Sequence, residues 1–175
     1  LPVGRGIANF LRGLRRMRLP DAVAITTFAI ATVAIIAVAI TTVGCSDPCA
    51  TTEGEDALVR AAAVEGAIRT ESGLVFLLLQ EGSGPRPVAG NRVQVHYEGR
   101  LLDGTIFDSS YERGNPSSFG LDEVIPGWTE GLQMLEGGGK ARLTIPPGLA
   151  YGKRGKRGKI EPCATLVFDV ELLGI

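Results

Sequence analysis

From Ser72 onward the sequence alternates apolar and polar residues in short segments that glycine and proline separate. This pattern is typical of an antiparallel sheet, because successive side chains of a strand point to opposite faces. Val93, Val95 and Tyr97 are predicted to be buried, whereas His96 between them faces outward and is not expected to be a catalyst. The predicted strands lie at residues 74–80, 93–98, 140–145 and 164–173, with a hairpin turn at the Asp-Gly pair 103–104.

A short helix is predicted between the second and third of these strands. Pro126 begins it, at a position where the missing N–H of proline costs nothing. Trp128, the single tryptophan, shares one helical face with Leu132 and Leu135. Taken alone, this pattern indicates a small core helix. The expected fold is an α+β layer in which an antiparallel sheet of about five strands wraps over one short helix.

An apolar run of 22 residues from Ala22 to Val43 contains no charge and no proline. About 20 helical residues cross a bilayer core, so this segment is expected to enter a membrane. Five arginines and no acid precede Asp21, and cationic flanks stay on the cytoplasmic side. The rest of the chain is therefore expected to lie across the membrane, in a periplasm or an organelle lumen.

Three fates of this segment remain open from the sequence. It is longer than the apolar region of most signal peptides, which favours a retained single-pass anchor. Residues 42–45 also resemble the end of a bacterial lipoprotein signal, in which Cys45 would carry the lipid, and a simple cleaved signal is the third possibility. Cys45 and Cys49 could close a small disulfide loop, or they could be unrelated cysteines of a linker.

The sequence divides into a basic N-terminal segment (1–21), a transmembrane anchor or signal sequence (22–43), an acidic linker (44–69) and a domain (70–175). The linker includes one helix predicted from Glu55 to Ile68. A formal net charge of −1 argues against nucleic acid as a partner. His96 is the only histidine, so no metal site is expected.

Five motifs in the domain carry a resemblance to a known family. They are His96-Tyr97-Glu98-Gly99, Gly104-Thr105-Ile106-Phe107-Asp108-Ser109-Ser110, Val124-Ile125-Pro126-Gly127-Trp128, Ala150-Tyr151-Gly152 and Ala164-Thr165-Leu166-Val167-Phe168-Asp169-Val170-Glu171-Leu172. In order and spacing they resemble an FKBP-type peptidyl-prolyl cis-trans isomerase. Residues 65–74 are similar to the start of the domain in the bacterial macrophage-infectivity-potentiator branch. The long dimerising helix of that branch is not found, so a monomer is expected.

The chemistry of such an enzyme suits these residues. Rotation about an X-Pro bond faces a barrier of about 18–20 kcal/mol, because the planar amide loses its resonance. An enzyme lowers this barrier by binding the twisted amide more tightly than the planar one. A dry aromatic pocket does so by removing the water that stabilises the planar, more polar amide. Neither a nucleophile nor a cofactor is needed.

The resemblance assigns a role to each pocket residue. Trp128 would be the floor under the substrate proline, and Ile125 N–H and Tyr151 hydroxyl would bind carbonyls of the peptide. Asp108 would act electrostatically, paired with Arg113. The catalytic residues implied are Tyr97, Phe107, Asp108, Ile125, Trp128, Tyr151 and Phe168, and the substrate-binding residues are Arg113, Phe119, Val124 and Ile160. Read without the motifs, Asp108 would be a turn-forming aspartate.

Three features depart from the family pattern. Ser117 stands where some members have an aromatic residue, and Glu161 replaces a common proline. The loop 153–159 holds five cations where members commonly have apolar or proline residues, although the rest of the domain has six basic and thirteen acidic residues. The loop could be a solvated tip, could favour acidic substrates, or could contact anionic lipid headgroups.

The resemblance implies a prolyl isomerase that assists the folding of proteins across the membrane. Its partners would be proline-containing polypeptides, the membrane through residues 22–43, and macrolide inhibitors of the family. Two alternatives come from other classes: a chaperone module that holds prolyl segments with little turnover, and a purely structural membrane scaffold. The complete pocket set favours the enzyme, because a scaffold has no need of it.

Overall fold

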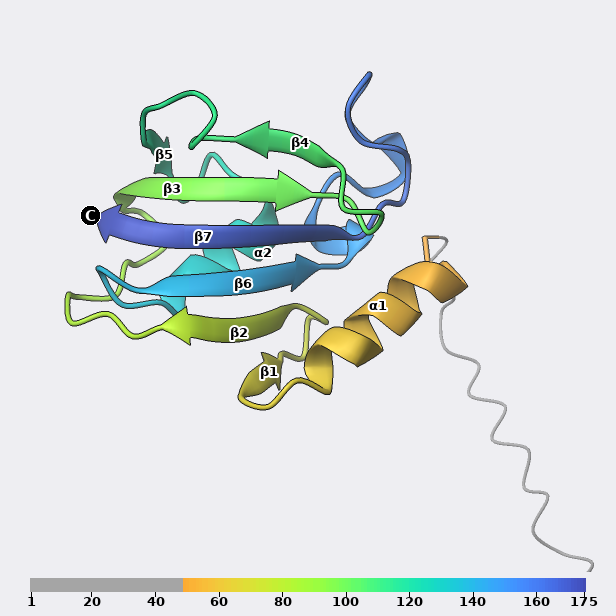
Figure 1. Cartoon of the computed structure of the whole chain (residues 1–175), viewed down its shortest axis with the longest axis horizontal. Coiled ribbons are helices and arrows are strands. Elements are labelled where there is room, and N and C mark those ends of the chain that lie inside the picture. The colour runs from red at the N-terminus through yellow and green to blue at the C-terminus, as the bar shows by residue number, and fades with distance from the viewer. Residues whose placement is uncertain (1–48) are drawn as a thin grey trace, which may run out of the picture. The chain divides into compact units, whose positions relative to one another are not determined.

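The computed structural model describes residues 49–175, which form a seven-stranded antiparallel sheet and two α-helices (Figure 1). Along the sheet the strand order is β1-β2-β6-β7-β3-β4, and β5 pairs with β3 beside this row. The elements are α1 (Thr52–Ala62), β1 (Ala67–Arg69), β2 (Val75–Gln80), β3 (Arg92–Arg100), β4 (Ile106–Ser109), β5 (Ser117–Gly120), α2 (Pro126–Gln133), β6 (Lys140–Ile145) and β7 (Leu166–Gly174), with 3-10 turns η1 (Pro147–Leu149) and η2 (Gly152–Arg154).

The two central strands, β3 and β7, supply the middle of the core. Tyr97 of β3 pairs with Val170 of β7, and Gly99 pairs with Phe168. The predicted alternation of β3 is confirmed, because Val93, Val95 and Tyr97 are buried. The same holds for Ala141, Leu143 and Ile145 of β6 and for Leu166, Phe168, Val170 and Leu172 of β7.

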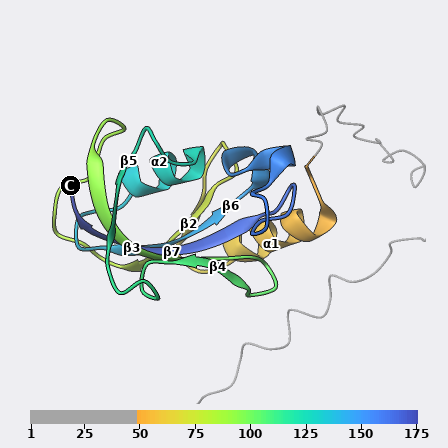
Figure 2. The same cartoon turned by 90° about the horizontal axis from the view of Figure 1, so that it is seen from above.

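Helix α2 lies across this buried face of the sheet (Figure 2). Pro126 occupies its first turn, and Trp128, Leu132 and Leu135 are buried, as their spacing predicts. The helix approaches β6 closely because its contact residues lack side chains. A Cβ atom on Gly127 would lie 2.5 Å from Cγ2 of Ile145, which fixes the height of the neighbouring Trp128 above the sheet.

We expect Gly127→Ala to destabilise the fold by about 1–3 kcal/mol, the usual cost of overpacking a tight core. Ile145 is fully buried and cannot move aside freely. Gly90→Ala is the matched control, because a Cβ atom there has no heavy atom within 4 Å. Urea denaturation followed by circular dichroism measures both. Equal midpoints for the two variants would contradict the close packing of α2.

The strand count and the first helix differ from the sequence prediction. The sheet has seven strands instead of about five, because the short strands β1 and β5 join it. Helix α1 covers Thr52–Ala62, where we expected a helix from Glu55 to Ile68. Gly66 has φ +80°, a left-handed conformation that interrupts a helix. Ile68 then pairs with Phe76 of β2.

The described part of the predicted linker is folded with the sheet. Helix α1 and β1 belong to the same compact unit as the seven strands. Ala57 and Ala61 of α1 face Val75 and Thr144, on the face of the sheet opposite to α2. The compact unit therefore includes residues before 70, since α1 packs on the outer face of the sheet.

The cysteine pairing also differs from both sequence interpretations. Cys49 forms a disulfide with Cys163, 114 residues further along the chain, with 4.9 Å between their Cα atoms. Cys49 is therefore neither the partner of Cys45 nor an unrelated linker cysteine. The bond connects the residues just before α1 to the segment that precedes β7.

The predicted membrane segment 22–43 and Cys45 lie outside the described residues. Within residues 49–175, none of the helices combines the length and the apolar character that crossing a bilayer requires.

Candidate active site

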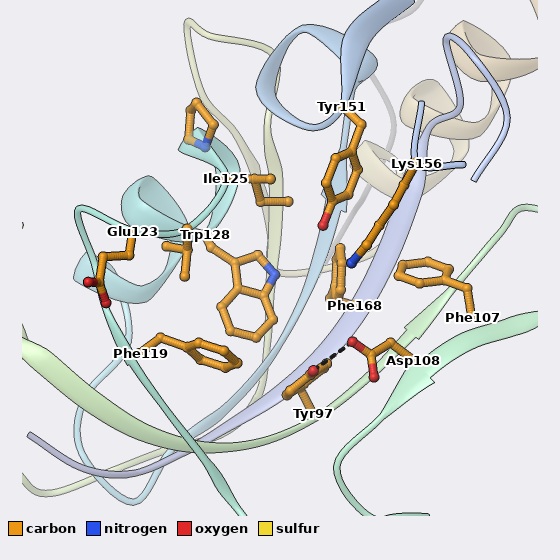
Figure 3. Close-up of a pocket in the computed structure, with 12 residues that line it drawn as sticks. Tyr97, Phe107, Asp108, Phe119, Glu123, Ile125, Trp128, Tyr151, Lys156 and Phe168 are labelled. Atoms are coloured by element: carbon orange, nitrogen blue, oxygen red, sulfur yellow. Dashed lines mark hydrogen bonds between the residues drawn. The ribbon is translucent and has the colours of Figure 1, made fainter. Parts of the chain in front are cut away.

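A pocket of about 470 Å³ opens between α2, the central strands and the loops after β6 (Figure 3). Its wall residues come from β3, β4, β5, β7, α2, the segment just before α2 and the loops after β6. They are Tyr97, Phe107, Asp108, Phe119, Glu123, Val124, Ile125, Pro126, Trp128, Tyr151, Lys156 and Phe168. Aromatic rings dominate this set, and the polar groups are few, which is typical of a ligand-binding pocket.

Trp128 lies at the bottom of the pocket and is only 4% exposed. The rings of Tyr97, Phe119 and Phe168 stand nearly perpendicular to its indole, at centroid distances of 5.0, 5.7 and 5.3 Å. Aromatic pairs favour such edge-to-face contacts. The indole N–H is buried and has no acceptor within the described domain, so the floor offers a donor as well as an apolar surface.

The opposite wall depends on a glycine in β3. Phe107 and Phe168 pack edge to face, with centroids 5.4 Å apart. Both rings lie against the backbone of Gly99, where a Cβ atom would approach each of them to 2.7 Å. This explains why the His-Tyr-Glu-Gly motif ends in glycine: a side chain there would displace two walls of the pocket.

A hydrogen-bonded group of three side chains closes one side of the pocket. The Tyr97 hydroxyl donates to Oδ2 of Asp108 at 2.8 Å, and Arg113 donates both to Asp108 and to the Tyr97 oxygen at 3.0 Å. Arg113 also donates to Oγ of Ser117 at 3.0 Å. Ser117, where some members have an aromatic residue, is therefore a partner of the arginine.

These contacts set the protonation of the group. Burial by itself raises the pKa of Asp108, but hydrogen bonds from Tyr97 and Arg113 and the charges of Arg113 and Lys159 outweigh it, so the pKa falls below its ordinary value. Burial and the hydrogen bond to Asp108 raise the pKa of Tyr97. At neutral pH the carboxylate is thus ionised, and the phenol keeps the proton that it donates.

We expect Asp108→Asn to lower the melting temperature by about 2–4 °C, since a partly exposed charge-assisted bond contributes about 1 kcal/mol. A depressed folded-state pKa adds stability above the ordinary value of 3.8 and loses it as pH falls through the lower folded value. The difference in melting temperature between wild type and variant should therefore be constant above about pH 5 and should shrink toward zero below pH 4. Calorimetry from pH 3 to 8 measures it. A difference that grew on acidification would contradict this assignment.

Two donors on residues that line the pocket have no hydrogen-bond partner within the described part of the chain. The backbone N–H of Ile125, the residue that precedes α2, makes no hydrogen bond within residues 49–175. The same is true of the Tyr151 hydroxyl, which lies on the far side of the pocket from Phe119 (Figure 3). An extended peptide could accept from both of these groups.

Nine of the eleven predicted site residues line the pocket, and two do not. Arg113 stands behind the wall and reaches the pocket through Asp108 and Tyr97. Ile160, predicted to bind substrate, is 5% exposed and belongs to the hydrophobic core. His96 lies outside the pocket, as expected, stacked on Tyr111 at 4.6 Å.

The sequence prediction missed three lining residues, which are Glu123, Pro126 and Lys156. Glu123 and Pro126 flank the predicted pair Val124-Ile125, so their proximity was a usable signal. Lys156 had a weaker signal, because it lies in the cationic loop and nothing in the sequence says which of the five charges turns inward.

The layered sheet, the crossing helix and the aromatic pocket between them define the class of an FKBP-like domain. Residues 84–173 match the family model of the FKBP-type peptidyl-prolyl cis-trans isomerase. The chain is 51% identical over 123 residues to the FKBP-type 22 kDa peptidyl-prolyl cis-trans isomerase of Escherichia coli, covering 70% of this chain and 60% of that protein. It is 52% identical over 115 residues to the macrophage infectivity potentiator of Trypanosoma cruzi, covering 65% and 59%.

Solved structures agree with these relatives. The crystal structure of FkpA from Escherichia coli gives a TM-score of 0.67 at 50% identity, covering 69% of this chain and 56% of that one. A peptidyl-prolyl isomerase of Pseudomonas syringae gives 0.65 at 41% identity, covering 69% and 89%. The chain belongs to the FKBP-type peptidyl-prolyl cis-trans isomerase family. It spans 42 to 60% of the length of the three curated Escherichia coli and Neisseria meningitidis relatives that it matches well.

Proposed function

We propose that the chain is a peptidyl-prolyl cis-trans isomerase, which catalyses rotation about X-Pro bonds and so assists protein folding. The observation that carries this proposal is the apolar pocket over Trp128, bordered by two donors, Ile125 N–H and Tyr151 hydroxyl, that have no partner in the domain. Family membership supports it, and the names of the relatives agree with it.

The first part of the mechanism is desolvation. A proline ring seated on Trp128 places its amide among Tyr97, Phe107 and Phe168, where water cannot solvate the carbonyl. The planar amide is the more polar form, so it loses more stabilisation in this pocket than the twisted one does. Binding the twisted form more tightly lowers the barrier.

The second part is positioning. Ile125 N–H and the Tyr151 hydroxyl hold carbonyls on the two sides of the rotating bond, so that one side turns while the other stays fixed. The Asp108 carboxylate, held by Tyr97 and Arg113, provides a fixed negative charge at the edge of the pocket. A preorganised charge stabilises the redistribution of charge in the transition state without the cost of reorganising water.

The direct test is magnetisation-exchange NMR on a short prolyl peptide with the full chain in non-ionic detergent. The exchange rate of cis and trans signals should rise at protein concentrations far below that of the peptide. Uncatalysed exchange takes tens of seconds or longer, so the effect is readily measured. Exchange as slow as in buffer, with the protein folded, would contradict the proposal. A macrolide inhibitor of the family should bind the same pocket and suppress the effect.

We further propose that this domain lies across a membrane from the arginine-rich segment, as a single-pass protein. Support comes from the apolar run 22–43, from the arginines before it, and from the Cys49–Cys163 disulfide. Structural disulfides persist in oxidising compartments. The mass of the mature protein distinguishes a retained anchor from a cleaved signal or a lipid on Cys45. Protease digestion of sealed vesicles then reports the side on which the domain lies.

A further inference from the structure

The five cations of the loop 153–159 differ from most other basic residues of the described part of the chain, of which only Arg60 and Lys140 also lack a carboxylate partner. Six arginines outside the loop each pair with a carboxylate. Within residues 49–175, none of the loop cations forms an ion pair, and these are Lys153, Arg154, Lys156, Arg157 and Lys159. The loop therefore carries positive charge that no direct ion pair within residues 49–175 neutralises.

One of these cations turns into the pocket. Lys156 lines it together with Tyr151, and the ammonium lies 5.6 Å from the centre of the Tyr151 ring. Figure 3 shows the side chain of Lys156 extending from the loop toward the centre of the pocket, between Tyr151 and Phe107. The charge thus stands where a bound peptide would pass.

The backbone of Lys156 is fixed by the core. Lys156 N–H donates to the carbonyl of Ile160 at 2.8 Å, and Ile160 N–H donates back to the carbonyl of Lys156 at the same distance. Ile160 is buried among the core residues. It therefore anchors the loop, and this explains its place beside the pocket although it does not line it.

The two acidic residues of the pocket do not neutralise Lys156. Glu123 lies at the opposite end of the pocket (Figure 3), where it accepts from Gly120 N–H at 3.2 Å and pairs with Arg92 at 3.5 Å. Asp108 is paired with Arg113. An acidic group on a bound peptide would meet Lys156 as an available partner.

We propose that Lys156 selects prolyl peptides that carry a glutamate or aspartate immediately beside the proline, an inference that rests on the proposed isomerase function. Neighbouring Cα atoms are about 3.8 Å apart, so a residue next to the proline on Trp128 is within reach of the opposite rim. The other four loop charges add a weaker, screened attraction. Because the Lys156 ammonium lies over the Tyr151 ring at the edge of the pocket, a bound peptide is the better match than a lipid surface.

The test compares glutamate with its neutral isostere glutamine. Catalytic efficiency is measured with the full chain on Ala-Xaa-Pro-Phe and Ala-Leu-Pro-Xaa peptides at low salt. In at least one position glutamate should be favoured about two- to fivefold, the range of a solvent-exposed ion pair. At 1 M salt the Debye length falls to about 3 Å, and the ratio should approach one.

Two variants with the same loss of charge locate the effect. Lys156→Gln should bring the glutamate-to-glutamine ratio close to one, whereas Lys153→Gln, which removes an exposed charge outside the pocket, should leave it near the wild-type value. A wild-type ratio of one, with the Ala-Leu-Pro-Phe peptide still isomerised, would overturn the selectivity and leave the proposed function standing. Equal loss of binding to phosphatidylglycerol vesicles in both variants, with unchanged peptide ratios, would assign the loop to lipid and also overturn it.

Failure of the proposed function is distinguishable from failure of this inference. If no peptide is isomerised faster than in buffer, the enzyme assignment fails. The fluorescence of Trp128, the single tryptophan, then reports binding of the same peptides, and tighter binding of glutamate than glutamine that Lys156→Gln abolishes would still support the selectivity. Equal affinities would refute it.

Discussion

Replacing Trp128 with alanine is expected to lower the isomerase efficiency by about 10- to 100-fold. The floor of the pocket disappears, and a bound proline loses about 1.5–3 kcal/mol of apolar contact, with each 1.4 kcal/mol equal to a factor of ten. The same substitution should cost about 3–5 kcal/mol of folding free energy, because three aromatic rings pack on the indole. Assays of peptide exchange and of denaturant unfolding measure the two effects separately.

Leu74→Ala is the control for the loss of stability. Leu74 is fully buried in the same core but does not line the pocket, and its truncation should cost about 2–5 kcal/mol. At temperatures where both variants are folded, it should retain most of the activity that Trp128→Ala loses. If Trp128→Ala does not fold, Trp128→Phe keeps an aromatic floor and should show an intermediate loss. Equal activity of Leu74→Ala and the Trp128 variant would mean that the indole serves packing alone.

Breaking the Cys49–Cys163 disulfide is expected to cost about 2–5 kcal/mol of folding free energy. The bond closes a loop across a sequence separation of 114 residues, and long loops lose the most entropy in the unfolded chain when they are closed. It also holds the residues before α1 against the segment that follows the cationic loop. Cys163→Ser, or treatment with dithiothreitol, should therefore lower the melting temperature by roughly 5–15 °C.

Cys45→Ser separates this bond from general effects of cysteine loss. It should leave the melting temperature unchanged under oxidising conditions, because the described disulfide uses the other two cysteines. Peptide mapping without reduction should recover a fragment that joins Cys49 to Cys163. A fragment that joins Cys45 to Cys49, together with a stable Cys163→Ser variant, would contradict the structure.

The sheet could be predicted because its strands obey a local rule. Val93, Val95 and Tyr97 alternate with polar residues, and one face of the sheet is buried, so the pattern survives folding. The first helix was harder to delimit, because the turn at Gly66 and the pairing of β1 with β2 depend on residues distant from the helix pattern. The disulfide could not be derived either, since pairing over such a separation is a property of the fold and not of spacing.

The pocket was predicted mainly through motifs, and the exceptions have physical causes. The large aromatic side chains of Tyr97, Phe107 and Trp128 indicate a binding site where they lie together, because they carry much apolar surface. Ile160 is an apolar residue directly after the cationic loop, and a sequence does not say whether such a residue faces ligand or core. Lys156 was overlooked for the opposite reason, because a lysine is expected in solvent until the structure places its ammonium over the Tyr151 ring.

The central claim, catalysis of X-Pro rotation, is tested most directly by refolding a protein whose slow phase is limited by prolyl isomerisation. At about one part in a hundred, the full chain should accelerate the slow phase, leave its final amplitude unchanged, and lose this effect when Trp128 is replaced by alanine. Catalysis requires turnover, so a chaperone that only holds prolyl segments would not act at this ratio. An unchanged slow phase, with peptide binding still visible in the Trp128 fluorescence, would contradict the account and identify a binding module.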